Sequence, residues 1–215
     1  MKKAIISGAS RGIGKALKEG FENAGWQVLG TTTSSNHETL CALDLSDSAS
    51  IAAFKEHVLG EFGTIDLLVN NAGILLEDWS TPDINLEELK KTLSVNLVGT
   101  VELTESLVPF MNPNGHIINI SSTWGSFSNP KFSDLQPHYK ISKAALNMYT
   151  KVLAHRLGDT SLKVSAVDPG WVKTDMGGTN GLRHPHEVFD DIHWLVTNPD
   201  VTTGHFWREK RMREW

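Results

Sequence analysis

"KAIISGASRGIG", residues 3–14, joins a short apolar run to a loop that holds three glycines. The apolar run has the length of a buried strand, and a helical pattern follows the loop. Glycines between a strand and a helix permit a tight turn and bring backbone N–H groups close to a phosphate at the helix N-terminus. Gly8, Gly12 and Gly14 are spaced G-x-x-x-G-x-G, unlike the G-x-G-x-x-G of the usual dinucleotide fingerprint. The stretch predicts a phosphate-binding loop, and a tight turn that holds no ligand is the alternative.

The same alternation of short apolar runs and longer helical patterns continues along the chain, which is typical of βαβ units and a parallel sheet. We expect strands at residues 3–7, 26–31, 39–45, 65–72, 115–122 and 162–170, with "TTGHFW" (202–207) as an edge strand. We expect helices over residues 11–24, 48–62, 86–110 (long or broken) and 139–157. The predicted fold class is α/β, a doubly wound parallel sheet of the Rossmann type, with residues 1–215 forming a single dinucleotide-binding domain.

Composition and charge exclude several classes of protein. The 215 residues are 40% hydrophobic and 21% charged, which is ordinary for a globular chain. The formal net charge is −5 and no Lys/Arg run precedes the last residues, so a nucleic-acid partner is not expected. The tail "WREKRMREW" (207–215) is locally basic but also holds Glu209 and Glu214, so we expect a solvated terminus.

Cysteine and histidine usage bears on compartment and on metals. Cys41 is the only cysteine, so no internal disulfide can form, and a reducing cytoplasm is expected. The first apolar run ends at Ser7-Gly8 and no later run approaches the length of a membrane span, so we expect no export or membrane segment. His184 and His186 are expected in a loop with no third ligand nearby, and no metal site is predicted.

"HYKISKAAL", residues 138–146, places Tyr139 four residues ahead of Lys143. At that spacing two side chains are neighbours on a helix surface. An ammonium group beside a phenol favours the ionised phenol, so the pair is a candidate general acid with a lowered pKa. The alternative is a half-buried aromatic residue beside a solvated charge.

Polar residues follow two further predicted strands. "NNAG" (70–73) ends the fourth strand, and Ser121-Ser122 ends the fifth. Ligands of doubly wound sheets bind at the carboxyl ends of the strands. Local backbone bonding and turn formation remain the alternatives for these residues.

Taken in order, these motifs resemble the short-chain dehydrogenases/reductases. The resemblance runs from residue 2 to about residue 176, and "DPGWVKTDMGG" (168–178) looks like the carbonyl-reductase and C-signal-like members. "TTGHFWREKRMREW" (202–215) also looks like the family's closing strand. The motifs that carry the resemblance are Gly8-x-x-x-Gly12-x-Gly14, Asn70-Asn71-Ala72-Gly73, Asn96, Ser122, Tyr139-x-x-x-Lys143 and Pro169-Gly170.

The resemblance implies a catalytic set. Tyr139 would deliver a proton to a carbonyl oxygen as hydride reaches the carbon. Lys143 would lower the phenol pKa and hold the nicotinamide ribose. Ser122, rather than Ser121, would orient the carbonyl, and Asn96 would anchor a water that links Lys143 to solvent. The implied reaction reduces an aldehyde or ketone, or runs in reverse, and the implied partner is a small carbonyl or alcohol substrate, with homo-oligomer formation left open.

The resemblance also implies where a cofactor lies. Its pyrophosphate would sit on the glycine loop, Asp44 would bond the adenine, and Thr174 would bond the nicotinamide carboxamide. For Asp44, a plain cap or turn role is the alternative. The implied cofactor-binding residues are Gly8, Ser10, Arg11, Gly12, Ile13, Gly14, Thr32, Asp44, Leu45, Asn71, Ala72, Gly73, Tyr139, Lys143, Pro169, Gly170, Val172 and Thr174.

The end of the second strand bears on which nicotinamide cofactor is used. An NAD site usually has an acidic residue there, but the position falls at Thr32, followed by Thr33 and Ser34. Arg11 matches a family position that reaches the 2′-phosphate, so we expect NADP(H) to be preferred over NAD(H). Arg11 on a solvated helix face is the alternative. A nucleotide-binding signalling or regulatory protein with little turnover is the alternative to an enzyme.

Overall fold

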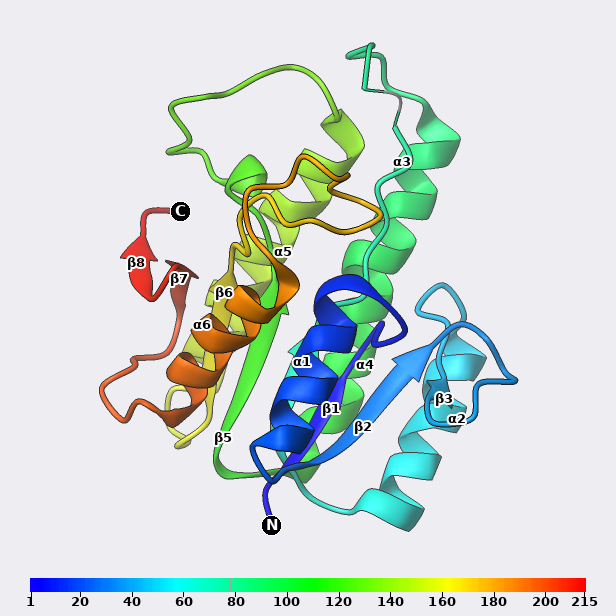
Figure 1. Ribbon diagram of the computed structural model, residues 1–215, viewed down its shortest axis with the longest axis vertical. Helices are drawn as coiled ribbons and strands as arrows, with labels where there is room; N and C mark the ends of the chain where they lie inside the picture. The colour runs from blue at the N-terminus through cyan, green and yellow to red at the C-terminus, as the bar shows by residue number, and fades with distance from the viewer. Residues whose placement is uncertain (78) are drawn as a thin grey trace.

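The computed structural model describes residues 1–77 and 79–215 and shows one eight-stranded sheet with helices on both faces (Figure 1). The strand order is β3-β2-β1-β4-β5-β6-β7-β8, and every neighbouring pair is parallel except β7 and β8. The prediction of a doubly wound α/β fold is confirmed. The strands are β1 (Lys3–Ile6), β2 (Gln27–Thr32), β3 (Cys41–Ala42), β4 (Ile65–Asn70), β5 (Met111–Ile120), β6 (Lys163–Val167), β7 (His205–Arg208) and β8 (Arg211–Arg213).

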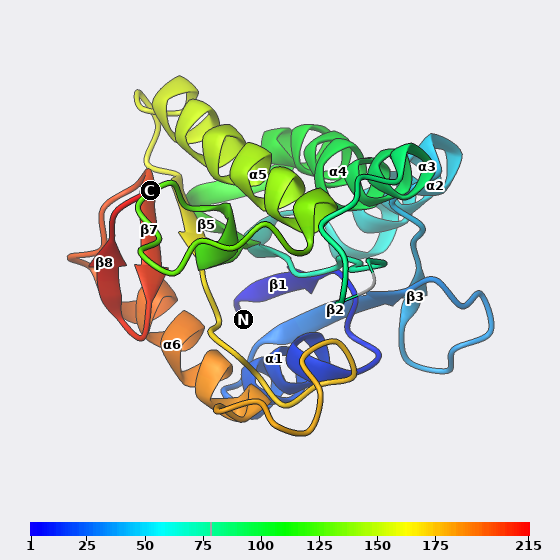
Figure 2. The same ribbon diagram turned by 90° about the horizontal axis from the view of Figure 1, so that it is seen from above.

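Figure 2 shows the sheet between two helical layers, with α1 and α6 on one face and α2, α3, α4 and α5 on the other. The α-helices are α1 (Gly12–Asn23), α2 (Ser48–His57), α3 (Leu86–Leu93), α4 (Thr100–Leu107), α5 (Pro137–Arg156) and α6 (Pro185–Thr197). Single turns of π-helix, η1 (Val58–Phe62) and η2 (Ser94–Gly99), extend or join them, with short 3₁₀ turns at η3 (Val108–Phe110) and η4 (Thr123–Gly125).

The central strands are buried on both faces, which explains their apolar sequences. In β4, Leu67 and Val69 pack in the core beneath α1 and α6, while Leu68 packs in the core beneath α2, α4 and α5. Successive side chains of a strand point to opposite faces, so a strand covered on both sides needs an unbroken apolar run. The sheet is thereby held between two separate cores, and only its edges and strand ends remain for ligands.

The helical stretch expected over residues 86–110 is broken. The π-helical turn η2 joins α3 to α4, and it carries the buried Asn96. Single π turns inside helices are frequent at functional sites. Helical periodicity alone does not reveal one, because the side-chain pattern on either side of the turn is still helical.

The chain end differs from expectation in its strand pairing. β7 is not the edge strand, because β8 pairs with it antiparallel through a turn in which Glu209 and Lys210 adopt positive φ. The tail is otherwise solvated as expected, because residues 209–214 are exposed, although the Trp215 ring stacks on Phe206 with centroids 5.6 Å apart.

Three smaller expectations also need correction. The third strand is only two residues long rather than seven, and no element was expected where α6 lies. His186 therefore sits in a helix, not in a loop, while His184 caps that helix. The Glu187 carboxylate accepts a hydrogen bond from the His184 backbone N–H at 2.6 Å, and Pro185 is the first helical residue, a start signal present in the sequence. Within residues 1–77 and 79–215, no helix is both long and apolar enough to cross a membrane.

Candidate active site

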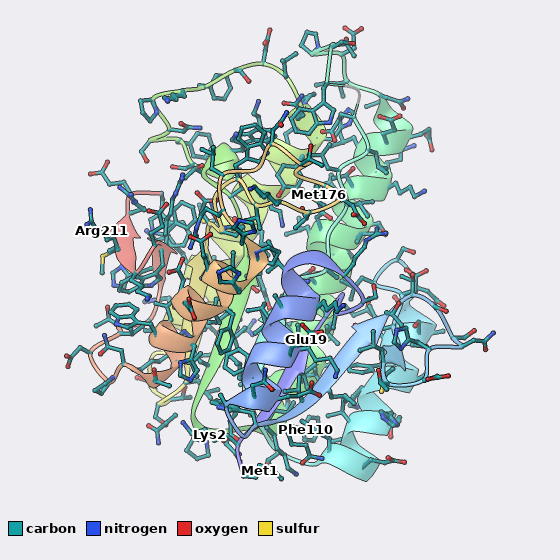
Figure 3. The ribbon with its side chains drawn as sticks, viewed as in Figure 1. Met1, Lys2, Glu19, Phe110, Met176 and Arg211 are labelled. Carbon is teal, nitrogen blue, oxygen red and sulfur yellow. The ribbon has the colours of Figure 1, made fainter. Side chains whose placement is uncertain are left out.

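A cavity of about 750 Å³ opens at the carboxyl ends of the parallel strands, within the size range of small-molecule sites. Figure 3 shows Met176, which lines it, in the upper half of the molecule, while Met1 lies at the lower end. Of the residues predicted for catalysis or cofactor binding, all of which the structure describes, only Asn96 lies outside the cavity wall. The topology of the sheet thus brings predicted site residues between positions 8 and 174 to the wall of one cavity.

The glycine loop forms part of this wall at the N-terminus of α1. Gly8 and Gly12 have φ of 68° and 56°, values that favour glycine. A Cβ at Gly8 would lie 3.0 Å from the Cα of Ala72, so the loop packs directly against the segment after β4. Among the described residues, no side chain caps α1, which leaves the first N–H groups of the helix directed at the cavity wall. Such a terminus favours an anion.

Ser7 and Asn71 tie the glycine loop to the end of β4. Ser7 Oγ accepts hydrogen bonds from the backbone N–H groups of Asn71 and Ala72, both at 3.0 Å. Asn71 Nδ2 donates to the carbonyl oxygens of Ser7 and Gly8 at 2.9 and 3.1 Å. The amide of Asn71 therefore shapes the loop, which is a more specific role than the predicted packing beside a cofactor.

Tyr139 and Lys143 lie side by side on α5. Lys143 Nζ is 5.4 Å from the centroid of the Tyr139 ring and donates to the Ile120 carbonyl oxygen at 2.8 Å. Lys143 is buried, so the alternative of a solvated charge is wrong. Burial lowers the pKa of Lys143 to about 8.

The predicted lowering of the phenol pKa is not found. Desolvation, followed by the negative charges of Asp168 and Glu77, raises the pKa of Tyr139 above its ordinary value. Lys143 directs its ammonium toward Ile120 and the phenol ring, and its own charge is disfavoured by burial. Tyr139 is consequently held in its protonated form, the form that a general acid requires.

The two serines after β5 have different surroundings. Ser121 is buried, and its Oγ donates to Asn147 Oδ1 at 2.5 Å. Ser122 lines the cavity and accepts from the Trp124 backbone N–H at 3.1 Å, which leaves its own hydroxyl proton available. The geometry therefore agrees with the choice of Ser122 over Ser121.

Asn96 lies behind the wall rather than on it. Its side chain exchanges two hydrogen bonds with the backbone of Ile74, at 2.7 and 2.8 Å, and donates to Ser142 Oγ at 3.1 Å. A Cβ at Gly73 would lie 3.3 Å from Asn96 Oδ1 and 3.7 Å from Lys143 Nζ. Asn96 thus fixes the Gly73–Ile74 segment beside the ammonium of Lys143.

The predicted nucleotide contacts line the cavity but also have local partners. Asp44 Oδ1 accepts from the backbone N–H and the hydroxyl of Ser46, and these bonds lower the pKa of Asp44. Thr174 Oγ1 accepts from the Gly177 N–H at 3.0 Å. The exposed Arg11 lies with Nε 3.4 Å from Asp175 Oδ2. Contacts within the protein therefore already orient the side chains of Asp44, Thr174 and Arg11.

Several residues of the wall were not predicted. Trp79, Trp124 and Trp171 come from three different segments, and their rings are apolar surface at the cavity. Trp124 packs edge-to-face on both Tyr139 and Trp79, with centroids 6.1 and 5.9 Å apart. Trp79 is 53% exposed, which is unusual for tryptophan without a ligand or partner. Proximity of Trp124 and Trp171 to catalytic motifs was the only sequence signal.

Asp168 and Arg208 complete the wall beside the Pro169-Gly170 turn. Arg208 Nη1 lies 3.3 Å from the buried Asp168 Oδ2. Within residues 1–77 and 79–215, no group of three His, Cys, Asp or Glu side chains is placed to hold a metal ion.

Comparison with known proteins identifies the family. A family model described as short chain dehydrogenase matches residues 2–183. The chain belongs to the short-chain dehydrogenases. It is 34% identical over 188 residues to the 3-oxoacyl-[acyl-carrier-protein] reductase FabG of Escherichia coli (strain K12), which covers 81% of this chain and 75% of that protein. The Thermotoga maritima protein of the same name is 34% identical over 191 residues, covering 81% and 76%. Membership makes this short-chain dehydrogenase an NAD(P)-dependent oxidoreductase.

Solved structures share the fold of this short-chain dehydrogenase. A short-chain dehydrogenase/reductase from Serratia marcescens BCRC 10948 superposes with a TM-score of 0.85 at 26% identity, covering 96% of this chain and 95% of that one. The carbonyl reductase Sniffer of D. melanogaster gives 0.89 at 24% identity and 100% coverage of both chains. A Burkholderia cenocepacia J2315 short chain dehydrogenase in complex with NADP gives 0.86 at 24% identity, covering 96% and 95%.

Proposed function

We propose that this short-chain dehydrogenase uses NADP(H) to reduce an aldehyde or ketone to an alcohol, or to run the reverse oxidation. The observation that carries the proposal is the convergence of Tyr139, Lys143 and Ser122 on the same cavity that the glycine loop lines. A proton donor, a cation and a hydroxyl at one wall are the groups that carbonyl reduction requires.

The roles of the three side chains follow from their chemistry. A nicotinamide cofactor supplies hydride to the carbonyl carbon when bound. Tyr139 donates its phenol proton to the carbonyl oxygen as hydride reaches the carbon. Without this donor the reaction would have to form a free alkoxide, which is strongly basic and therefore unfavourable. Ser122 Oγ donates a hydrogen bond to the same oxygen and so fixes the carbonyl. Lys143 would hold the ribose of the cofactor, and its pKa of about 8 permits it to return a proton to Tyr139 near neutral pH.

The chain's own residues fit an NADP(H) cofactor. The uncapped N-terminus of α1 and the positive-φ glycines offer backbone N–H groups to a pyrophosphate. β2 ends in threonines, and the guanidinium of Arg11 stands free of the core at the cavity wall. A guanidinium can bind a 2′-phosphate with two parallel hydrogen bonds. The NADP in the Burkholderia cenocepacia structure agrees with this proposal.

The wall around Tyr139 supports an apolar substrate. Trp124 contacts the Tyr139 ring, and Trp79, Trp171 and Met176 line the same cavity. Aromatic walls favour flat apolar groups through edge-to-face and offset contacts worth about 0.5–1.5 kcal/mol each. We infer that the carbonyl group is attached to an aromatic or other bulky apolar group.

The test is turnover of NADPH with pairs of aldehydes that carry either an aromatic ring or an unbranched aliphatic chain of similar size. The wild type is expected to give the higher kcat/KM with the aromatic member, and Trp79→Ala is expected to reduce that ratio about threefold to tenfold. Trp194→Phe, on α6 and outside the cavity wall, is the matched control. NADPH binding without turnover of any carbonyl compound would instead support a regulatory protein of the same fold.

A cytoplasmic location belongs to this proposal. The single Cys41 agrees with a reducing compartment, in which disulfides contribute little to stability. Fractionation of cells with an antibody against the protein tests this part independently of turnover.

A further inference from the structure

Glu77 is a carboxylate buried beside the first turn of α5, although it belongs to the segment between β4 and α3. It is only 6% exposed. Its Oε1 accepts a hydrogen bond from the backbone N–H of Tyr139 at 2.6 Å. Among the described residues, its Oε2 has no hydrogen-bond partner. A carboxylate loses several kcal/mol of hydration on burial, so its presence here requires a compensating interaction.

The start of α5 explains that interaction. The residue before the helix, Gln136, has a left-handed φ of 53° and makes no side-chain cap in the part of the chain that the structure describes. Tyr139 is the third helical residue, and its N–H is one of those that a helix leaves without an intrahelical partner. Glu77 satisfies this donor from a different segment and places a negative charge at the positive end of the helix. It therefore replaces the missing N-cap.

His138 packs against the same carboxylate. The backbone N–H of Asn85 donates to His138 Nε2 at 3.0 Å, so Nε2 must be an acceptor and Nδ1 must carry the proton of a neutral imidazole. Nδ1 lies 3.5 Å from Glu77 Oε1 and 3.8 Å from Glu88 Oε2. His138 is 1% exposed, so its ring is a fixed support. Asn85, His138 and Glu77 together fix the first turn of α5 to the segment before α3.

We propose that Glu77 is a positioning residue for Tyr139, which sets the place of the phenol by binding the backbone of the same residue. The inference rests on the proposed role of Tyr139 as the proton donor. A fixed backbone at Tyr139 fixes the ring between Trp124 and Lys143. Misplacement of a reacting group by about 1 Å can lower a rate about 100-fold, so such an anchor has a direct effect on turnover.

The charge of Glu77 has a second, separable effect. Together with desolvation and Asp168, it raises the pKa of Tyr139. The charged or titratable groups around Tyr139 are Asp168 after β6, Lys143 on α5 and Glu77. Those around Glu77 are His138 and Lys140 on α5, and Glu88 on α3 lies near His138. Removing the charge of Glu77 alone lowers the pKa of Tyr139 toward its ordinary value and leaves Asp168 in place.

Two substitutions separate anchoring from charge. Glu77→Gln keeps a carbonyl oxygen that can accept from the Tyr139 N–H, so kcat near neutral pH is expected to stay within about threefold of wild type. Glu77→Ala loses the acceptor, and its kcat is expected to fall about tenfold to 100-fold, with the Kd of NADPH from fluorescence titration unchanged. Glu87→Ala on the exposed face of α3 is the matched control and should match wild type throughout.

The outcomes distinguish this inference from the proposed function. Tyr139→Phe is measured in parallel, and a Phe variant with wild-type turnover overturns the role of Tyr139 itself. An inactive Phe variant together with a Glu77→Ala variant of wild-type kcat overturns only the positioning role. If Glu77→Ala does not fold, as judged by circular dichroism, the kcat of Glu77→Gln tests the positioning role of Glu77 instead. A kcat loss in Glu77→Gln as large as that of Tyr139→Phe then overturns the inference.

Discussion

Lys143 Nζ lies over the ring of Tyr139, 5.4 Å from its centroid, and donates its hydrogen bond to the Ile120 carbonyl. The two pKa values move in opposite directions from their ordinary values: burial lowers that of Lys143 to about 8, and desolvation raises that of Tyr139. Both changes favour the neutral forms of the two side chains. The phenol therefore keeps its proton until a substrate oxygen takes it, and Lys143 can exchange a proton near neutral pH.

Tyr139→Phe should remove most turnover and leave cofactor binding nearly intact. The phenol proton is needed at the carbonyl oxygen, while the ring and its contact with Trp124 are kept. Loss of a positioned acid typically reduces a rate about 10²- to 10⁴-fold. Single-turnover kinetics with NADPH, compared with the Kd of NADPH from fluorescence titration, measure the two effects separately. Near wild-type turnover in the Phe variant would contradict the assignment of the acid.

Lys143→Met should lose turnover and cofactor affinity, yet make the cofactor-free protein more stable at neutral pH. Burial lowers the Lys143 pKa from 10.5 to about 8, a penalty of about 3 kcal/mol on the ammonium. The lost hydrogen bond to Ile120 offsets about 1 kcal/mol of the gain, so a net stabilisation of about 2 kcal/mol is expected. The free energy of unfolding, from urea titration at pH 7, measures it.

The pH dependence gives a check on the same residue. Between pH about 8 and 10.5 the unfolded chain binds a proton at Lys143 that the folded chain does not. The contribution of Lys143 to wild-type stability therefore rises with pH across that window, and the Met variant lacks this rise. Parallel stability curves for the two proteins over this range would contradict a buried ammonium at neutral pH.

The spacing of residues in the sequence was sufficient to predict those features of the fold and the site that depend on local helix or strand geometry. Apolar runs predicted the central strands because burial on both faces requires them. Helical spacing placed Tyr139 beside Lys143, and the carboxyl-edge rule placed Ser122 on the cavity. These inferences need only the period of a helix or strand and the topology of a parallel sheet.

The rest depends on contacts between distant segments. Glu77 reaches the N–H of Tyr139 across 62 positions of sequence, and no local pattern encodes that bond. The pKa of Tyr139 depends on Asp168 and Glu77, which only the folded chain brings near it. The pairing of β8 with β7 is accompanied by stacking of Trp215 on Phe206, which the local charge of the tail does not predict.

Gly14→Ala should disrupt the glycine loop. A Cβ at this position would overlap the Gly8 carbonyl oxygen and lie 2.5 Å from Asn71 Nδ2. Overpacking of this kind typically destabilises a fold by about 1–3 kcal/mol, and displacement of the loop should weaken NADPH binding at least about tenfold. Gly60→Ala is the matched control, because a Cβ there meets nothing within 4 Å. Unaltered NADPH affinity in a folded Gly14→Ala protein would count against the phosphate-loop assignment.

The expected preference for NADPH depends on the surroundings of Arg11. The Arg11 side chain is 78% exposed. It forms an ion pair with Asp175, a cavity residue in the segment that follows β6. Among the described residues, the acid of the wall nearest in sequence to the end of β2 is Asp44, whose carboxylate is hydrogen-bonded to Ser46. A 2′-phosphate at the end of β2 would therefore meet threonine hydroxyls and a guanidinium rather than a free carboxylate at that strand end.

Arg11→Ala should lower kcat/KM with NADPH about tenfold and leave the value with NADH nearly unchanged. A hydrogen bond between two charged groups contributes about 1.5–3 kcal/mol, and solvent exposure places this one at the lower end. Asp175→Asn should act in the opposite direction, because it releases Arg11 from a competing carboxylate. Lys15→Ala, which removes an exposed cation of α1 that pairs with Glu19, controls for net charge. The measurement is kcat/KM for both cofactors with one carbonyl substrate. An equal loss with both cofactors, or a wild-type value as high with NADH as with NADPH, would show that Arg11 does not select the 2′-phosphate.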